Sequence, residues 1–322
     1  MTQFRSEKVA ESVSTDARHT PMRRRIVFLG SPAAAVAVLE ALHAAGHDIA
    51  LVVTRPDARR GRGSSTVPTD VKKWALDHNL EITDDLTRVS EFADGNTLGV
   101  VVAYGRIIPA DLLEKMHMVN VHFSLLPRWR GAAPVERALL AGDSLTGVCI
   151  MDVEKGLDTG AVHAVAETTI MNTDTTTSLT ERLAHMGAEL LLEVLRGNLA
   201  NAAEQDGEAT YAHKVEKSEY VVDWGSSCVH VARQVRALPA LTFLSGKRLR
   251  ILECEVADDQ LADNRDGQAV TEQPGTLDAT GRVTCGSGSV ILRRVQPEGR
   301  SSMSFREWVN GSSVSFPVVL GV

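Results

Sequence analysis

Short apolar segments alternate with helix-like stretches in the first half of the chain. Residues 26–29 form an apolar segment before a Gly-Ser-Pro turn, and residues 33–46 have the composition of a helix that stops at a glycine. A second apolar segment (48–57) and a second helix-like stretch (69–79) follow. Residues 98–105 are a continuous β-branched run, typical of a strand covered on both faces. This alternation predicts an α/β domain with a parallel sheet and ligands at the carboxyl ends of its strands.

The pattern changes in the second half. Apolar positions between residues 179 and 194 recur every three or four residues, which predicts an amphipathic helix. The polar stretch 198–210 is typical of an interdomain linker. Beyond it, residues 247–256 and 281–295 suggest short strands joined by turns, so we expect a small β-rich second domain.

Composition narrows the class of protein. The chain has 322 residues, of which 43% are hydrophobic and 23% charged, as in an ordinary globular protein of about two domains. A net charge of −7 argues against a nonspecific nucleic-acid binder. No apolar stretch approaches the roughly 18 residues needed to span a membrane, and the first 24 residues lack a signal-peptide core. We therefore expect a cytoplasmic protein with no membrane contact.

Two polar residues interrupt the apolar segment that ends at Pro127. Asn120 and His122 lie two positions apart, so in a strand both side chains would project from one face while Val121 packs on the other. Pro127 cannot continue a central strand, which places the pair near a carboxyl end. Downstream, the Gly-bounded loop 154–160 presents Asp158. Amide, imidazole and carboxylate could meet in one crevice.

This trio suits acyl transfer through a tetrahedral intermediate. An amide and an imidazole can stabilise a developing oxyanion, and a carboxylate can orient the imidazole and help to move a proton. The residues alone leave another interpretation open, because a single histidine on a strand is more often a half-buried structural residue than a catalyst.

Metal and redox chemistry receive little support. The four cysteines form no C-x-x-C pair, and His117 and His122 are five positions apart without an H-E-x-x-H motif, so no metal is expected. Six further histidines have no visible partner in the sequence and are treated as structural or exposed: His43, His47, His163, His185, His213 and His230. The first turn lacks the G-x-G-x-x-G of dinucleotide-binding oxidoreductases, which weakens that alternative. A noncatalytic RNA-binding module would leave the trio unexplained.

Two motifs carry a family resemblance. "VVVAYGRIIP" (100–109) is followed by H-x-S-L-L-P at 122–127 and L-D-T-G at 157–160, a combination that resembles the folate-dependent formyltransferase family. The resemblance runs from about residue 25 to 310 and includes "ILRRVQPEGRSSMS" (291–304). It implies a Rossmann-like parallel-sheet domain followed by an OB-like barrel. It implies a catalytic domain (24–205) and a tRNA-contacting domain (206–322), after a polar segment (1–23) whose composition predicts a disordered tail.

The resemblance also implies substrates and sites. The co-substrate would be 10-formyltetrahydrofolate, the acceptor the α-amino group of methionyl initiator tRNA, and the enzyme a monomer. The residues that match the family's formyl-transfer centre are Asn120, His122 and Asp158. Those that match its folate-bordering segment are Ser124, Leu125, Leu126 and Pro127. Those that match its basic loop for the tRNA acceptor stem are Arg59, Arg60 and Arg62.

Departures from the family pattern lie outside the trio. These departures are the segments 31–36 and 237–243 and the serines at 64–65. They concern the strength and detail of tRNA recognition. Related enzymes that formylate nucleotide-linked amino sugars, and 10-formyltetrahydrofolate hydrolases, remain alternatives. A glycinamide ribonucleotide formyltransferase would share the trio but would give no role to residues 210–322.

Overall fold

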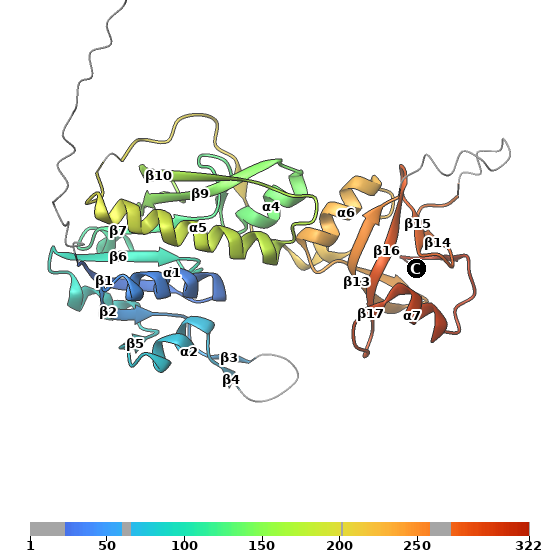
Figure 1. Ribbon diagram of the computed structural model, residues 1–322, viewed down its shortest axis with the longest axis horizontal. Helices are drawn as coiled ribbons and strands as arrows, with labels where there is room; N and C mark the ends of the chain where they lie inside the picture. Colours follow the sequence, from blue (N-terminus) through green and yellow to red (C-terminus); the bar gives the residue numbers. More distant parts are fainter. Residues whose placement is uncertain (1–22, 60–65, 201, 258–271, 322) are drawn as a thin grey trace, which may run out of the picture.

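The protein folds into two lobes joined by extended segments (Figure 1). The computed structural model describes residues 23–59, 66–200, 202–257 and 272–321. The expected disordered tail and the polar loop after residue 257 therefore lie almost wholly outside the described residues. Among the residues described, no helix combines the length and the apolar character that crossing a bilayer requires.

A seven-stranded sheet forms the centre of the first lobe, in the order β10-β9-β7-β6-β1-β2-β5. The neighbouring strands in the run β7-β6-β1-β2-β5 pair in parallel. Strand β9 is antiparallel to both of its neighbours, β7 and β10. The strands are β1 (Arg25–Gly30), β2 (Asp48–Val53), β5 (Ile82–Thr83), β6 (Thr97–Val102), β7 (Met118–His122), β9 (Leu145–Asp152) and β10 (Val162–Thr169). The predicted α/β domain with a parallel sheet is confirmed, with an antiparallel extension at one edge.

The helices of this lobe cover the sheet unequally. The α-helices of two turns or more are α1 (Ala33–Ala44), α2 (Asp70–Asp77), α4 (Pro134–Ala141) and α5 (Thr176–Arg196). The shorter helices are α3 (Ala110–Leu113) and the 3-10 helix η1 (Leu86–Phe92). Helices α1 and α5 pack on one face in a core that includes Val119 and Val121. A second core beneath η1 and α3 includes Met118 on the opposite face. The two faces of β7 therefore meet different surroundings.

Most predicted elements of this lobe are present with trimmed ends. The helix expected over 33–46 is α1, and the left-handed backbone of Gly46 follows it. The strand expected over 48–57 ends earlier, at Val53. All six residues of β6 are buried, as the β-branched run predicted. The amphipathic helix is α5, which begins with a capping box between Thr175 and Ser178.

The second lobe is an antiparallel, nearly closed barrel. Its sheet has the order β12-β13-β16-β15-β14-β18, with β17 pairing β16. The strands are β12 (Leu241–Leu244), β13 (Lys247–Val256), β14 (Thr276–Leu277), β15 (Arg282–Thr284), β16 (Ser289–Pro297), β17 (Met303–Ser304) and β18 (Val318–Val319). Helices α6 (Cys228–Ala237) and α7 (Phe305–Asn310) and the 3-10 helix η2 (Lys217–Tyr220) accompany it. The predicted β-rich domain is confirmed.

The polar stretch 198–210 does not behave as a free linker. Backbone groups of Ala203 and Val162 exchange two hydrogen bonds, and the hydroxyl of Thr210 accepts the backbone N–H of Trp129. Just beyond, β11 (Tyr211–Ala212) pairs in parallel with β8 (Arg130–Gly131). This part of the chain lies along the first lobe, close to the candidate residues. The remaining short strands, β3 (Ala58–Arg59) and β4 (Thr66–Val67), form a separate ribbon.

Candidate active site

Strand β7 places Asn120 and His122 on one face of the sheet. Alternate residues of a strand point to opposite faces, so the pair lies on the side away from the core of Val119 and Val121. Asn120 is half-buried, and His122 is only 5% exposed. Both lie at the carboxyl half of a parallel strand, as the sequence predicted.

Both ring nitrogens of His122 face protein oxygens. Nε2 lies 3.0 Å from the backbone carbonyl oxygen of Trp129, and Nδ1 lies 3.7 Å from Oδ2 of Asp158. The first distance fits a hydrogen bond, whereas the second is too long for one. The Trp129 carbonyl therefore fixes the ring, while Nδ1 and the carboxylate face each other with space for a small group or a proton to pass.

Asp158 is held by backbone and side-chain groups from two segments, β8 and the stretch that contains Gln205. Its Oδ2 accepts the backbone N–H of Gly131 at 2.7 Å. The Nε2 amide of Gln205 donates to the carbonyl oxygens of Asp158 (2.8 Å) and Gly160 (2.9 Å). The Oε1 of Gln205 accepts two hydrogen bonds from Arg130. These contacts bring the loop that carries Asp158 over the face that carries His122.

The segment after His122 folds into a tight turn. Ser124 is fully buried, and its hydroxyl donates to the carbonyl oxygen of Arg128 at 2.7 Å. The peptide bond between Leu126 and Pro127 is cis. Leu125, Leu126 and Pro127 are half-buried. The side chains of these three residues are therefore only partly covered, while the Ser124 hydroxyl is occupied within the turn.

Cys149 lies beside His122 on the neighbouring strand. The two residues are cross-strand partners, and the thiol donates to the carbonyl oxygen of Ser124 at 3.1 Å. Burial raises the pKa of Cys149 to about 11. A thiol at neutral pH is a poor nucleophile, so this cysteine is not equipped for covalent catalysis.

The basic residues predicted from the sequence are only partly described. Arg59 is exposed on the short strand β3, whereas Arg60 and Arg62 lie outside the described residues. In the second lobe, Arg248 pairs with Glu298 at 3.0 Å and Arg293 with Glu255 at 2.7 Å. Two arginines of this lobe that could meet phosphates thus already have acidic neighbours.

Several residues around the trio were not predicted. Some of these residues act through backbone groups, and others come from distant segments of the chain: Trp129, Gly131 and Gln205. Neither the periodicity of the apolar positions nor the spacing of a motif identifies them. The one available signal was the polar character of the stretch that contains Gln205, which was interpreted as a linker. The expectation that His163 has no partner was wrong, because its Nε2 lies 2.8 Å from Oδ1 of Asp152.

Comparisons with known proteins identify the family of the chain. The family model "Formyl transferase" matches residues 24–195, and "Formyl transferase, C-terminal domain" matches residues 214–313. Similar sequences include the methionyl-tRNA formyltransferase of Jannaschia sp., 39% identical over 310 residues, 92% of this chain and 99% of that protein. The methionyl-tRNA formyltransferase of Corynebacterium aurimucosum is 40% identical over 314 residues, 90% of this chain and 95% of that protein.

Solved structures share the fold at lower identity. HypX from Aquifex aeolicus in complex with tetrahydrofolic acid is 17% identical, with a TM-score of 0.61, covering 89% of this chain and 47% of that one. An N-formyltransferase from Helicobacter canadensis in complex with folinic acid and dTDP-3-aminofucose is 17% identical, with a TM-score of 0.60, covering 86% of this chain and 100% of that one. With both family models matched and close relatives aligned over nine-tenths of its length, the chain belongs to the formyltransferase family.

Proposed function

We propose that the protein transfers the formyl group of 10-formyltetrahydrofolate to the α-amino group of methionyl initiator tRNA, for translation initiation. The observation that carries the proposal is the similarity to methionyl-tRNA formyltransferases, which extends through both domains. Residues 24–205 would carry the chemistry and residues 206–322 would contact tRNA. We further propose that the enzyme acts as a monomer in the cytoplasm.

The chemistry requires little nucleophile activation. A free α-amino group titrates at about 7.7–8.0, so a substantial fraction is unprotonated near neutrality. The amine nitrogen attacks the formyl carbon, and the carbonyl oxygen becomes an oxyanion. The side-chain amide of Asn120 and the imidazole of His122 share one face of β7. The Asn120 amide can donate to that oxygen, and Nδ1 of His122 can donate to it when the ring carries a proton on both nitrogens, because Nε2 already donates to the Trp129 carbonyl. Each preorganised donor is worth about 3–4 kcal/mol in such a transition state.

Collapse of the intermediate completes the transfer. The bond between the formyl carbon and N10 of the folate breaks, and N10 gains a proton while the amine loses one. Asp158 and Nδ1 of His122, 3.7 Å apart, flank the space where that proton can move. Because the Trp129 carbonyl accepts from Nε2, the ring keeps its orientation whether or not Nδ1 carries a proton.

The half-buried turn after His122 supports a folate site. Leu125, Leu126 and Pro127 offer apolar contact for the pterin ring system, next to the proposed reaction centre. Ser124 contributes by shaping the turn, since its hydroxyl bonds to Arg128. The co-substrate would bind in the crevice above the carboxyl half of β7.

A direct assay tests the proposal. The purified chain is incubated with 10-formyltetrahydrofolate and methionyl initiator tRNA, with free methionine and a nucleotide-linked amino sugar as parallel acceptors. Formylation of the tRNA alone supports the proposed function. Formylation of the amino sugar alone would replace it with that rival activity, and folate turnover with no formylated acceptor would indicate a hydrolase.

Substitutions in the trio should separate catalysis from binding. We expect Asn120→Ala, His122→Ala and Asp158→Ala to lower kcat by about 10²–10⁴-fold, because each removes an oxyanion donor or a proton-transfer group. Folate affinity, measured by fluorescence titration, should change little. His185→Ala, an exposed change on α5, is the control. Unchanged turnover in one of the three variants would remove that residue from the mechanism.

A charge reversal in the basic loop that contains Arg59 should change the affinity for tRNA and leave the affinity for folate unchanged. Arg59→Glu is expected to raise the KM for tRNA and to make the salt dependence of binding shallower, by about one unit of slope for each phosphate that the loop no longer neutralises. Arg196→Glu, the same charge reversal at an exposed position in the last turn of α5, is the matched control. A changed KM for folate with an unchanged KM for tRNA would contradict the assignment.

A further inference from the structure

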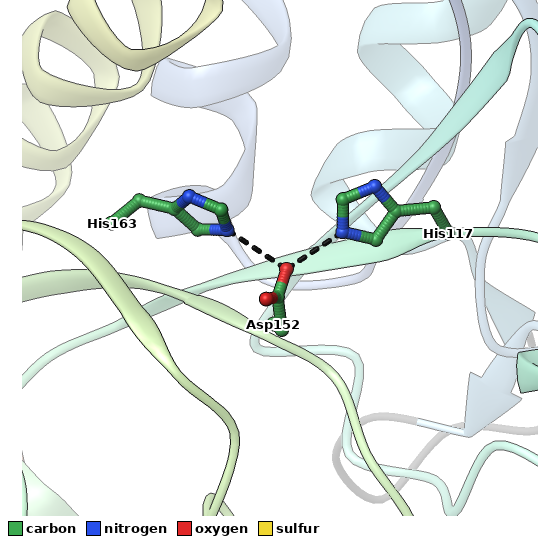
Figure 2. Close-up of side chains that lie close together, drawn as sticks. All are labelled: His117, Asp152 and His163. Atoms are coloured by element: carbon green, nitrogen blue, oxygen red, sulfur yellow. Dashed lines mark hydrogen bonds and ion pairs between the residues drawn. The ribbon is translucent and has the colours of Figure 1, made fainter. Parts of the chain in front are cut away.

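Three residues from separate segments of the chain form a compact cluster. His117 directly precedes β7, Asp152 ends β9, and His163 lies at the start of β10. Nε2 of His117 lies 2.7 Å and Nε2 of His163 lies 2.8 Å from the same oxygen, Oδ1 of Asp152 (Figure 2). The ligand-type atoms of all three side chains lie within 4.8 Å of one another.

This cluster is separate from the proposed reaction centre. Asp152 is the cross-strand partner of Val119, and such partners point to the same face of a sheet. Val119 packs in the core beneath α1 and α5, whereas Asn120 and His122 project from the other face. The cluster also lies near the amino end of β7, and His122 lies at its carboxyl end.

We propose that His117, Asp152 and His163 bind a divalent transition-metal ion of the Zn²⁺ class. Two imidazoles and one carboxylate are a donor set that suits zinc and its first-row neighbours, whereas Mg²⁺ and Ca²⁺ prefer oxygen ligands alone. Three protein ligands leave a fourth position of a tetrahedral ion for water.

Metal binding requires the three ligand atoms to shift: the two N···O distances lengthen, and the two imidazole nitrogens, which lie within 4.8 Å of each other, settle at the separation of a tetrahedral site. With metal–ligand distances of about 2.0–2.1 Å, the ligand atoms of a tetrahedral site stand roughly 3.3 Å apart. The present N···O distances of 2.7 and 2.8 Å therefore have to lengthen by about half an ångström. His163 is 3% exposed and fixed, but the His117 side chain is 51% exposed before the strand begins, so it can move.

The protonation states also fit. Burial raises the pKa of Asp152, but hydrogen bonds from His117 and His163 outweigh it and leave that pKa below its ordinary value, so the carboxylate is charged at neutral pH. A metal on Nε2 of His163 requires the ring proton on Nδ1. That nitrogen has no hydrogen-bond partner among the described residues, so the proton can occupy it without breaking another bond.

The consequence of binding is structural. Asp152 precedes and His163 follows the loop that carries Asp158, while His117 precedes the strand that carries Asn120. An ion held by all three would join the two stems of this loop to β7. We expect metal binding to stabilise the native state, because a ligand that binds only the folded chain raises its melting temperature.

The test is metal binding by the full-length chain. Protein stripped with a chelator is titrated with ZnCl₂ in a calorimeter, and with CoCl₂ while the visible d–d absorption is recorded. We expect saturable binding of one ion at this site, a rise in Tm, and no comparable response to MgCl₂. His117→Ala and His163→Ala each remove a ligand, so each should weaken Zn²⁺ binding by more than the roughly 10–100-fold that the loss of a hydrogen-bond partner of a ligand costs.

A second histidine pair supplies a matched control. The rings of His43 and His78, both exposed, lie 5.3 Å apart on α1 and after α2 without a carboxylate between them among the described residues. His78→Ala should leave binding unchanged. If the wild-type protein binds no Zn²⁺, or if His117→Ala binds as tightly as wild type, the proposal is wrong. His117 is half-exposed, so this variant decides the question even if His163→Ala fails to fold.

Discussion

The surroundings of His122 depend on two residues with left-handed backbone conformation. Trp129 has a φ of 64° and Asp158 a φ of 50°, and a non-glycine residue in this region costs roughly 1–2 kcal/mol. Contacts hold both in place. The Trp129 indole donates to Asp143 at 2.8 Å, and Gln205 donates to the Asp158 carbonyl oxygen. Such strained positions, held by their neighbours, are typical of preorganised sites.

Gly131 is a point at which this arrangement can be tested. Its φ is +124°, and a Cβ there would meet the carbonyl oxygen of Ala212 at 2.7 Å, within the β8–β11 pairing. Its N–H also holds Asp158. We expect Gly131→Ala to lower the free energy of unfolding by about 1–3 kcal/mol and to reduce kcat as Asp158 moves. Denaturant unfolding and the formyl-transfer assay measure the two effects.

A substitution at Gly299 allows the effect of backbone strain to be measured without the close contact that a Cβ makes at Gly131. Its φ is +73°, but a Cβ added there would meet no atom of the described residues within 4 Å. Gly299→Ala should therefore destabilise the protein by about 1 kcal/mol and leave kcat unchanged. Equal kcat in the two variants would show that the Gly131 contact with Asp158 has no bearing on turnover.

At the scale of single residues, the sequence predicts some of the contacts in the site and not others. Asn120 and His122 could be identified because a strand has a period of two, and Asp158 lies 3.7 Å from the His122 ring in the structure. The contact from the backbone carbonyl of Trp129 could not be predicted, because every residue has such a carbonyl group. His117, Asp152 and His163 come from three separate segments of the chain, so their proximity depends on the register of β7, β9 and β10, which no local pattern specifies.

At the scale of elements, two loops meet above β7. Residues 153–161 carry Asp158, and residues 202–210 lie against them through Gln205 and Ala203. The stretch that resembles a linker in composition thus closes the site from one side. Composition predicted a polar, irregular segment correctly, but where an irregular segment packs depends on hydrogen bonds to distant backbone groups.

Gln205 tests whether this contact matters for turnover. Gln205→Ala removes hydrogen bonds to the carbonyl oxygens of Asp158 and Gly160 and leaves the Arg130 guanidinium without its amide partner. We expect kcat to fall about 10-fold, since the loss of one or two such bonds, each worth about 1 kcal/mol, displaces the Asp158 loop. Glu204→Ala, at the exposed neighbouring position, should have no effect. A fall in stability without any change in kcat would limit Gln205 to a structural role.

At the scale of the whole molecule, the two domains meet through apolar and polar contacts, since Ala237 and Leu238 are buried in the core of the first domain. The hydroxyl of Thr176, at the start of α5, donates to the carbonyl oxygen of Ala237 at 2.7 Å. Arg236, in the last turn of α6, donates to the carbonyl oxygen of Asp174 at 3.0 Å. Both domains could be predicted from the change in pattern along the chain, but not these contacts, because they depend on how α5 and α6 meet.

An ion pair across this interface allows a pH test. Arg137 on α4 donates to both carboxylate oxygens of Glu219 in η2 and to the carbonyl oxygen of His213. The hydrogen bond from Arg137 is the main cause that lowers the pKa of Glu219 below its ordinary value of 4.5. A depressed carboxyl pKa stabilises the folded state above pH 4.5, and this contribution disappears as the pH falls through the folded-state pKa.

Glu219→Gln should therefore destabilise the protein in a pH-dependent way. Glutamine can still accept a hydrogen bond from Arg137 but carries no charge. Both partners are partly exposed, so we expect a loss of no more than about 1 kcal/mol at pH 7, shrinking toward zero once the glutamate of the wild type is itself protonated. Urea unfolding across the acidic range measures the difference. Glu40→Gln, exposed on α1, should show none at any pH. A difference that persists at the acid end would mean that Glu219 acts through packing or its η2 cap, and not through its charge on Arg137.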